Sequence, residues 1–364
     1  MSVEVVFWSV VLVRFFLPLL ILRYPLPAIV ACLIVDGVDQ TIFQTFGLDA
    51  PFYQGYDKAM DVFYLGIAYI STLRNWASLP AFNISRFLFF YRQIGVVAFE
   101  LTQVRALLLI FPNTFEYFFI AYESIRSRWN PTRYGMKFWL IAAALIWIFI
   151  KVPQEYWIHI AQLDFTDTVK NYPWFGPTIV IALLIALVIF WFIIRPRLDP
   201  ADHRWQFAAE PLPRAMDESH ERAAFMAQHG RVWSAASIEK VFLIGLLAVI
   251  FGSVLPGLAI SSLMLFIWTA VFVLINAAIG LWVVRNHWST ESVLAAFAAQ
   301  VVVNASLVVA VDVFWYESVD LQAGLFFVLL FSVLVTLYDR YRPVHEYRVA
   351  TLSLGAPADA GRHT

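Results

Sequence analysis

Repeated apolar stretches, each close to the ~20 residues that a helix needs to cross a bilayer, limit this chain to one class of fold. Their residues do not alternate between polar and apolar, as membrane-spanning β-strands would. The chain of 364 residues is 61% hydrophobic and 14% charged, whereas soluble domains carry about 25% charged residues. We therefore expect an all-α, polytopic helical bundle that is integral to a membrane.

The apolar stretches predict about 10 or 11 transmembrane helices. They lie at 5–22, 26–46, 59–79, 86–110, 138–160, 177–195, 240–256, 258–284, 291–313 and 322–338. Segment 112–125 leaves two alternatives open, because it is short and begins at a proline. If it crosses the membrane, the chain has eleven spans and an outside N-terminus; otherwise it has ten and an inside N-terminus. We favour eleven, which places Arg23, Arg74 and Arg86 on the cytoplasmic side.

The spans form two groups joined by a polar connection. Residues 1–195 are expected to form an N-terminal membrane bundle with a polar site, and 196–239 a cytoplasmic connecting segment. Residues 240–340 would form a C-terminal supporting bundle, and 341–364 a disordered cytoplasmic tail. Basic residues in the 126–137 loop, the connection and the tail place the C-terminus in the cytoplasm. The first apolar run lacks a basic leader, so we expect a retained first span, in a bacterial cytoplasmic membrane.

Ionisable side chains are concentrated in or beside apolar segments of the first 160 residues. A charge at the bilayer centre costs about 2.5–3.5 kcal/mol on insertion scales, so such residues face a protein interior or water. They are Asp36, Asp39, Asp57, Asp61, Arg92, Glu100, Arg105, Glu116, Lys151, Glu155 and His159. We therefore expect the functional site among spans two to five, supported by the C-terminal spans.

Four aspartates on two consecutive spans are the strongest candidates for this site. Asp36 and Asp39 are spaced i,i+3, and Asp57 and Asp61 i,i+4, so each pair shares a helix face. Four ionised carboxylates cannot share a dry site without metal ions, protons or arginines, and we predict that they bind Mg²⁺ or perform acid–base catalysis. Alternatively, the first pair contacts Arg14 or Arg92, and the second only caps a helix N-terminus.

Segment 86–110 supplies charges that complement the aspartates. Arg92 and Arg105 are predicted to hold an anionic head group, because a guanidinium is well suited to phosphate and carboxylate; alternatively they neutralise the aspartates. Glu100 is a further candidate catalytic acid or base. Pro112 then interrupts the helix beside Asn113 and Glu116, which we expect to line a substrate-binding site or to form a simple turn.

The stretch 151–159 completes the set of candidate residues. Lys151, Glu155 and His159 are each four residues apart and form one stripe along a helix that Pro153 should kink. Lys151 and Glu155 are predicted to bind substrate, and His159 to transfer protons near neutral pH. The alternative is a pairing network near the outer interface.

These patterns favour a membrane-embedded enzyme that acts on a lipid or isoprenoid substrate, phosphorylated substrates included. The alternatives are an ion- or proton-coupled transporter or channel, and a structural membrane subunit with internally paired charges. Expected partners are membrane lipids and a small-molecule or lipid ligand. The net charge of −1 argues against nucleic acid, and the single cysteine, Cys32, against an intrachain disulfide. No nucleotide-binding or zinc motif is present, and Mg²⁺ is the one cofactor predicted.

Overall fold

The computed structural model describes residues 3–45, 51–163, 165–254, 261–285, 297–299, 301–302, 305 and 321–353. Every element in this part of the chain is a helix, which confirms the all-α prediction. Five of the described helices are long and apolar enough to cross a membrane, which makes this an integral membrane bundle. They cover Val5–Leu22, Met136–Ile160, Phe175–Arg197, Ala235–Ser253 and Ser262–Trp282.

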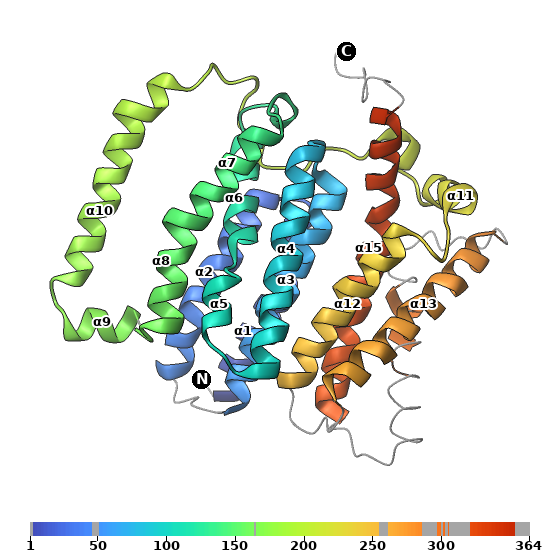
Figure 1. Ribbon diagram of the computed structural model, residues 1–364, viewed down its shortest axis with the longest axis horizontal. Coiled ribbons are helices and arrows are strands. Elements are labelled where there is room, and N and C mark those ends of the chain that lie inside the picture. The colour runs from blue at the N-terminus through green and yellow to red at the C-terminus, as the bar shows by residue number, and fades with distance from the viewer. Residues whose placement is uncertain are drawn as a thin grey trace.

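Each of the first four helices runs antiparallel to the one before it (Figure 1). They are α1 (Val3–Phe16), which continues into the 3-10 helix η1 (Leu17–Leu22), α2 (Pro25–Thr45), α3 (Pro51–Asn75) and α4 (Leu79–Thr102). Prolines start several of these helices, because a proline at the first turn loses no intrahelical hydrogen bond. Gln103 ends α4 in the left-handed conformation, with φ 57°, and so reverses the chain.

A broken helix follows α4 and runs back along it. It consists of α5 (Ala106–Ile110) and α6 (Thr114–Arg126), separated by Phe111, Pro112 and Asn113. Figure 1 shows α5 and α6 following one another from one end of the bundle towards the other. Segment 112–125 therefore runs along α4 inside the bundle. It is not among the five candidate spans, and its crossing of the membrane stays a prediction. The 3-10 turn η2 (Pro131–Arg133) then leads into the next helix.

The next crossing contains two π-helical turns. It comprises α7 (Met136–Ile146), the π-helix η3 (Trp147–Lys151), α8 (Val152–Glu155) and the π-helix η4 (Tyr156–Ile160). Pro153 lacks the N–H that would continue the regular ladder, which explains the wider turns. The chain returns through α9 (Phe165–Asn171), α10 (Phe175–Ile189), η5 (Phe190–Ile194) and η6 (Arg195–Arg197). None of the Phe175–Arg197 span is buried, and α10 lies at the outer side of the bundle (Figure 1).

The C-terminal helices pack directly on the N-terminal ones. After η7 (Arg214–Met216) and α11 (Ser219–His229), helix α12 (Ala235–Val254) contacts α3, α4 and α13 (Ser262–Arg285). The last helix, α15 (Leu321–Ser353), packs on α3 and α12. The two predicted groups of spans therefore share one core. Helix α15 also continues to Ser353, so residues 341–353 are helical where we expected disorder; packing of His345 and Val344 against the bundle stabilises this extension.

Helix α3 lies at the centre of the bundle. Nearly every side chain from Ala59 to Leu73 is buried, as expected for a helix surrounded by others. Aromatic rings fill the space beside it. The ring centroids of Tyr69 and Phe89 lie 4.6 Å apart, and those of the stacked Trp76 and Tyr122 lie 3.7 Å apart. Because α3 contacts so many neighbours, polar residues on it meet partners from several spans.

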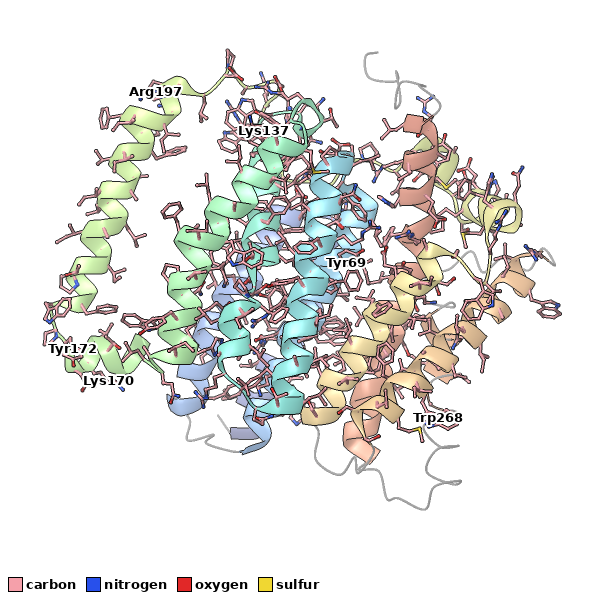
Figure 2. All side chains as sticks on the ribbon, viewed as in Figure 1. Tyr69, Lys137, Lys170, Tyr172, Arg197 and Trp268 are labelled. Carbon is pink, nitrogen blue, oxygen red and sulfur yellow. The ribbon has the colours of Figure 1, made fainter. Side chains whose placement is uncertain are left out.

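The two ends of the bundle carry different loops. Figure 2 shows Lys137 and Arg197 at one end and Lys170 and Tyr172 at the other. The 126–137 loop and the start of the 196–239 connection thus lie on the same side, and the loop after η4 on the opposite side. This arrangement agrees with the alternation of sides expected from the sequence. We call the two ends the Lys137 end and the Lys170 end.

Candidate functional site

Arg14 of α1 is surrounded by three carboxylates. Its guanidinium donates to Asp36 at 2.7 Å, and also to Asp39 and Asp61. Arg14 and Asp39 are almost fully buried, with 4% and 1% of the side chain exposed, whereas Asp36 and Asp61 are 30% and 38% exposed. Two spans supply the aspartates and a third the arginine. We call these four side chains the Arg14 cluster.

Spacing along one helix brings Asp36 and Asp39 together, and packing between helices brings Asp61 and Arg14 to them. Asp36 and Asp39 share a face of α2 because they are three residues apart. Asp61 reaches the same arginine from α3, which packs on both α1 and α2. Helix α3 also covers Asp57, but the side chain of Asp57 lies outside the described part of the structure. Gly37 faces open space, since a Cβ added there would meet nothing within 4 Å.

The Arg14 cluster carries an excess of negative charge when ionised. Three carboxylates contact one guanidinium, so full ionisation leaves the four side chains net negative. Like charges at this distance repel strongly where water is excluded, and protons or cations relieve that repulsion. The cluster is therefore suited to taking up positive charge.

Glu116 forms a second polar group beside the cluster. The Tyr64 hydroxyl and the Asn113 side-chain amide, at 3.0 Å, both donate to its carboxylate. Tyr64 lies one turn after Asp61 on α3, and Asp36 interacts electrostatically with both Tyr64 and Glu116. Glu116 thus lies within electrostatic range of the Arg14 cluster, and its hydrogen-bond partners come from α3 and from the break before α6.

Glu155 collects three donors at the kinked crossing. It accepts from the Asn113 backbone N–H at 3.0 Å and from His159 Nε2 at 3.0 Å, and the Lys151 Nζ lies at 3.4 Å. Lys151 also donates to Gln154 at 2.8 Å. The π-helical turns on both sides of Glu155 change the direction of these side chains, and such turns are frequent at functional sites.

Arg92 holds the break between α5 and α6. Its guanidinium donates to the Phe111 carbonyl at 2.9 Å, an acceptor that the broken helix leaves without its usual intrahelical donor. Gly95 allows the approach: a Cβ at this position would lie 2.1 Å from the Phe111 Cβ. Arg92 also interacts electrostatically with Glu116 and Glu155. Helix α4 therefore positions the break and adds a positive charge to it.

The structure brings together most, but not all, of the predicted residues. Asp36, Asp39, Asp61, Arg92, Asn113, Glu116, Lys151, Glu155 and His159 lie in the connected groups described above. Glu100 instead pairs with Lys58 at 3.0 Å. Arg105 is exposed at the N-cap of α5.

Sequence reasoning gave too little weight to Arg14, Tyr64 and Gln154. Arg14 appeared only as one alternative partner of Asp36, yet it is the centre of the cluster. A signal was available, because Arg14 is the only charged residue between Glu4 and Arg23 in a strongly apolar run. Tyr64 and Gln154 carry no such signal, since a single hydroxyl or amide in a span is common.

The described residues contain no group of three or more histidine, cysteine, aspartate or glutamate side chains arranged to hold a metal ion. Arg14 lies between three of the four aspartates predicted to bind Mg²⁺, and the side chain of Asp57 lies outside the described part of the structure. The arrangement around Arg14 is that of an ion-pair cluster. Mg²⁺ binding by the aspartates stays a prediction.

A second charged network joins the two halves of the chain. Glu239 of α12 accepts from the Tyr69 hydroxyl at 2.6 Å, from Arg342 at 2.7 Å and from Tyr338 at 3.3 Å, and Arg86 lies at 3.4 Å. These partners come from α3, α4 and α15. The sequence did not predict this network, and its full pairing is typical of a structural connection between helices.

Comparison with known proteins does not add a family to this description. No family model, no curated protein and no solved structure matches the chain.

Proposed function

We propose that this protein is a cation-coupled membrane transporter whose Arg14 cluster binds the coupling cation, most simply a proton. The observation that carries the proposal is the contact of three carboxylates with one buried guanidinium. Carboxylates gathered around one guanidinium in the membrane interior are expected where protons or ions bind. Arg14 would hold the carboxylates together while their protonation or cation occupancy changes.

Beyond the Arg14 cluster, a series of polar and titratable side chains leads from one contact to the next. Tyr64 links α3 to Glu116, Asn113 bridges Glu116 and Glu155, and Glu155 contacts His159. Carboxylates, a phenol and an imidazole in contact with one another are the groups that relay protons through membrane proteins. The arrangement supports proton movement between the cluster and η4. Basic loops favour the Lys137 end, where α15 also ends, as the cytoplasmic side (Figure 1).

A membrane-embedded enzyme acting on a lipid or isoprenoid substrate is the second candidate. The observation that favours it is the partial exposure of Asp36 and Asp61, next to the open space at Gly37. A ligand head group could reach these carboxylates from the side of α2. Mass spectrometry of molecules extracted from the purified protein distinguishes the candidates: a specific lipid or isoprenoid retained by the wild type and lost in Asp36→Asn would favour the enzyme.

Thermal unfolding of the purified full-length chain tests cation binding without knowledge of the transported substrate. A ligand that binds only the native state at about 100 times its Kd stabilises it by about 2.7 kcal/mol. Melting temperatures would be measured from pH 5 to 9, and with Na⁺, K⁺, Li⁺, Mg²⁺ or Ca²⁺ at constant ionic strength. We expect wild type to be stabilised by one cation, or by lowering the pH from 9 to 6.5, above the range in which His345 affects stability, and Asp39→Asn to lose most of that effect.

Asp199→Asn is the matched control for this experiment. It makes the same chemical change at an exposed carboxylate that pairs with Arg133 outside the bundle, so it should keep the wild-type response. Identical pH and cation responses in wild type, Asp39→Asn and Asp199→Asn would overturn the proposal. Transport itself is then measured in vesicles as movement of the stabilising cation, which Asp39→Asn should abolish.

A further inference from the structure

Buried polar atoms that lack a hydrogen-bond partner gather where α4 packs on α6. Within the described part of the chain, they belong to residues no more than 2% exposed. These residues are Ser78, the N-cap of α4, Ser85 and Gln93 of α4, and Thr114 and Arg126 of α6. Gln93 is the clearest case, because both the nitrogen and the oxygen of its amide are unpartnered. We call this set the α4–α6 seam.

Contacts between the two antiparallel helices place these residues in order along the seam. Gly95 lies against Phe111, and the Phe89 ring lies 5.2 Å from the Phe115 ring. Further along, Tyr122 lies beside the backbone of Ser78. Gln93 is thus level with the break before α6, and Ser78 is level with the far end of α6.

Two neighbouring residues extend the seam at its ends. At the break, the Asn113 side-chain oxygen is buried and unpartnered, although its amide donates to Glu116. At the other end, Trp139 of α7 has an unpartnered ring N–H, and its ring lies 5.2 Å from that of Tyr122. Arg126 there leads into the basic 126–137 loop at the Lys137 end. The unpartnered atoms therefore run from Glu116 and Asn113 to one end of the bundle.

Isolated polar atoms in a dry helix interface are unfavourable, because the bilayer interior offers no replacement partner. Buried water ordinarily provides the missing hydrogen bonds, and each molecule needs several polar neighbours. One unpartnered polar atom would be satisfied by one buried water molecule. The row of unpartnered atoms along α4 and α6 therefore indicates several water molecules in a row.

We infer that the α4–α6 seam is hydrated and gives water and protons from the Lys137 end access to Glu116. The role of the seam in transport rests on the proposed function. The hydration of the seam is inferred from its unpartnered atoms alone. A proton would move along the water molecules, each step breaking one O–H bond and forming another on the next oxygen. It would end on a carboxylate oxygen of Glu116, and no further reactant is needed.

Cysteine accessibility tests hydration directly. The chain has a single cysteine, Cys32, so Cys32→Ser provides a background without thiols. In that background, Ser85→Cys and Gln93→Cys would be exposed to a small, cationic, membrane-impermeant methanethiosulfonate applied from the Lys137 end of the full-length protein in vesicles. We expect both to react at least tenfold faster than Ser71→Cys.

Ser71→Cys is a matched control because Ser71 is equally buried, on α3, but its hydroxyl donates to the Ile21 carbonyl at 3.2 Å. If Ser85→Cys and Gln93→Cys react as slowly as Ser71→Cys, the seam is dry and the inference is wrong. A second measurement needs no substitution: in hydroxyl-radical footprinting, with each rate divided by that of the same residue type in the unfolded chain, Tyr122 should be less protected than Phe119, which is equally buried on α6. Equal protection of the two rings would also contradict a hydrated seam.

Neither readout depends on cation binding or transport. Loss of the cation response in the unfolding experiment would overturn the proposed function while leaving a hydrated seam in place. Slow labelling and protected Tyr122 would overturn the seam while leaving the Arg14 cluster as a cation site. Gln93→Leu separates them further: if the seam carries protons, it should slow proton movement at least tenfold but keep the cation-dependent stabilisation.

Discussion

The backbone N–H of Asn113 donates to the Glu155 carboxylate at 3.0 Å, and this bond joins the break before α6 to the π-helical part of the neighbouring crossing. Both segments depart from regular helix next to a proline, Pro112 in one and Pro153 in the other. An N–H freed by one broken helix is thus satisfied by a side chain from another. The two irregular segments stabilise each other and bring Glu116 and Glu155 together.

Replacement of Glu155 should leave Lys151 without its closest countercharge. Removing one partner of a buried ion pair costs about 3–5 kcal/mol, because the other charge stays buried. We expect Glu155→Gln to lower the melting temperature, although glutamine can still accept from Asn113. Lys151→Met in the same protein should restore much of the loss, and thermal unfolding of both single variants and the double variant measures this coupling. Additive effects would contradict a direct interaction.

Arg14 should matter more than any one of its aspartates. Arg14→Met leaves three carboxylates facing one another, whereas Asp39→Asn removes one of three negative charges. We expect Arg14→Met to destabilise the protein by at least about 3 kcal/mol and Asp39→Asn to cost less or even to stabilise it. Arg14→Lys keeps the charge but not the planar fork, and should fall between wild type and Arg14→Met. Chemical unfolding in detergent gives the ranking, and equal losses in Arg14→Met and Asp39→Asn would refute it.

The sequence predicted those parts of the fold and site that depend on local spacing. The apolar stretches indicated the class of fold, and the i,i+4 stripe of Lys151, Glu155 and His159 forms the contacts expected of it. Pro112 and Pro153 marked the two irregular segments. Each of these features follows from the periodicity of a helix or the missing N–H of proline.

Contacts between distant segments could not be predicted in this way. The choice of Arg14 over Arg92 as partner of the aspartates depends on how α1 packs on α2 and α3. Glu239 and Arg342 are 103 residues apart, and nothing in either span indicates the pairing. Which helices adjoin is set by shape and aromatic packing in the core, and hydropathy does not record it.

Gly95 is expected to be intolerant of any side chain. A methyl group there would lie 2.1 Å from the Phe111 Cβ, an atom fixed to the backbone of the break, so α4 or the break must move. We expect Gly95→Ala to destabilise the protein and to weaken the Arg92–Phe111 contact. Gly37→Ala is the control: it meets nothing within 4 Å and should be neutral or stabilising by up to about 1 kcal/mol from helix propensity. Melting temperatures that change alike in the two variants would contradict the close approach.

Acid should destabilise the extension of α15 through His345. Burial, together with repulsion of the protonated ring by Arg342, Arg348 and Arg86, lowers the pKa of His345 to about 3. The imidazole ring packs against Phe82, with 3.9 Å between the ring centroids. The unfolded chain binds this proton near pH 6.5 and the native chain only near pH 3, so between these values the unfolded state holds more protons. His345 therefore does not lower the free energy of unfolding above about pH 6.5. Below that, it lowers the free energy of unfolding by about 1.4 kcal/mol per pH unit as the pH drops towards 3.

His345→Gln removes the titrating group but keeps a polar side chain of similar size, so its unfolding free energy should depend less on pH between 6 and 4 than that of wild type. His220→Gln is the comparison, because His220 is exposed at the start of α11 and contacts Glu218 at 3.0 Å. Denaturant unfolding across this pH range measures both slopes. A wild-type slope that survives in His345→Gln would show that other groups cause the acid sensitivity, and that the buried imidazole is not the group titrating in the native bundle.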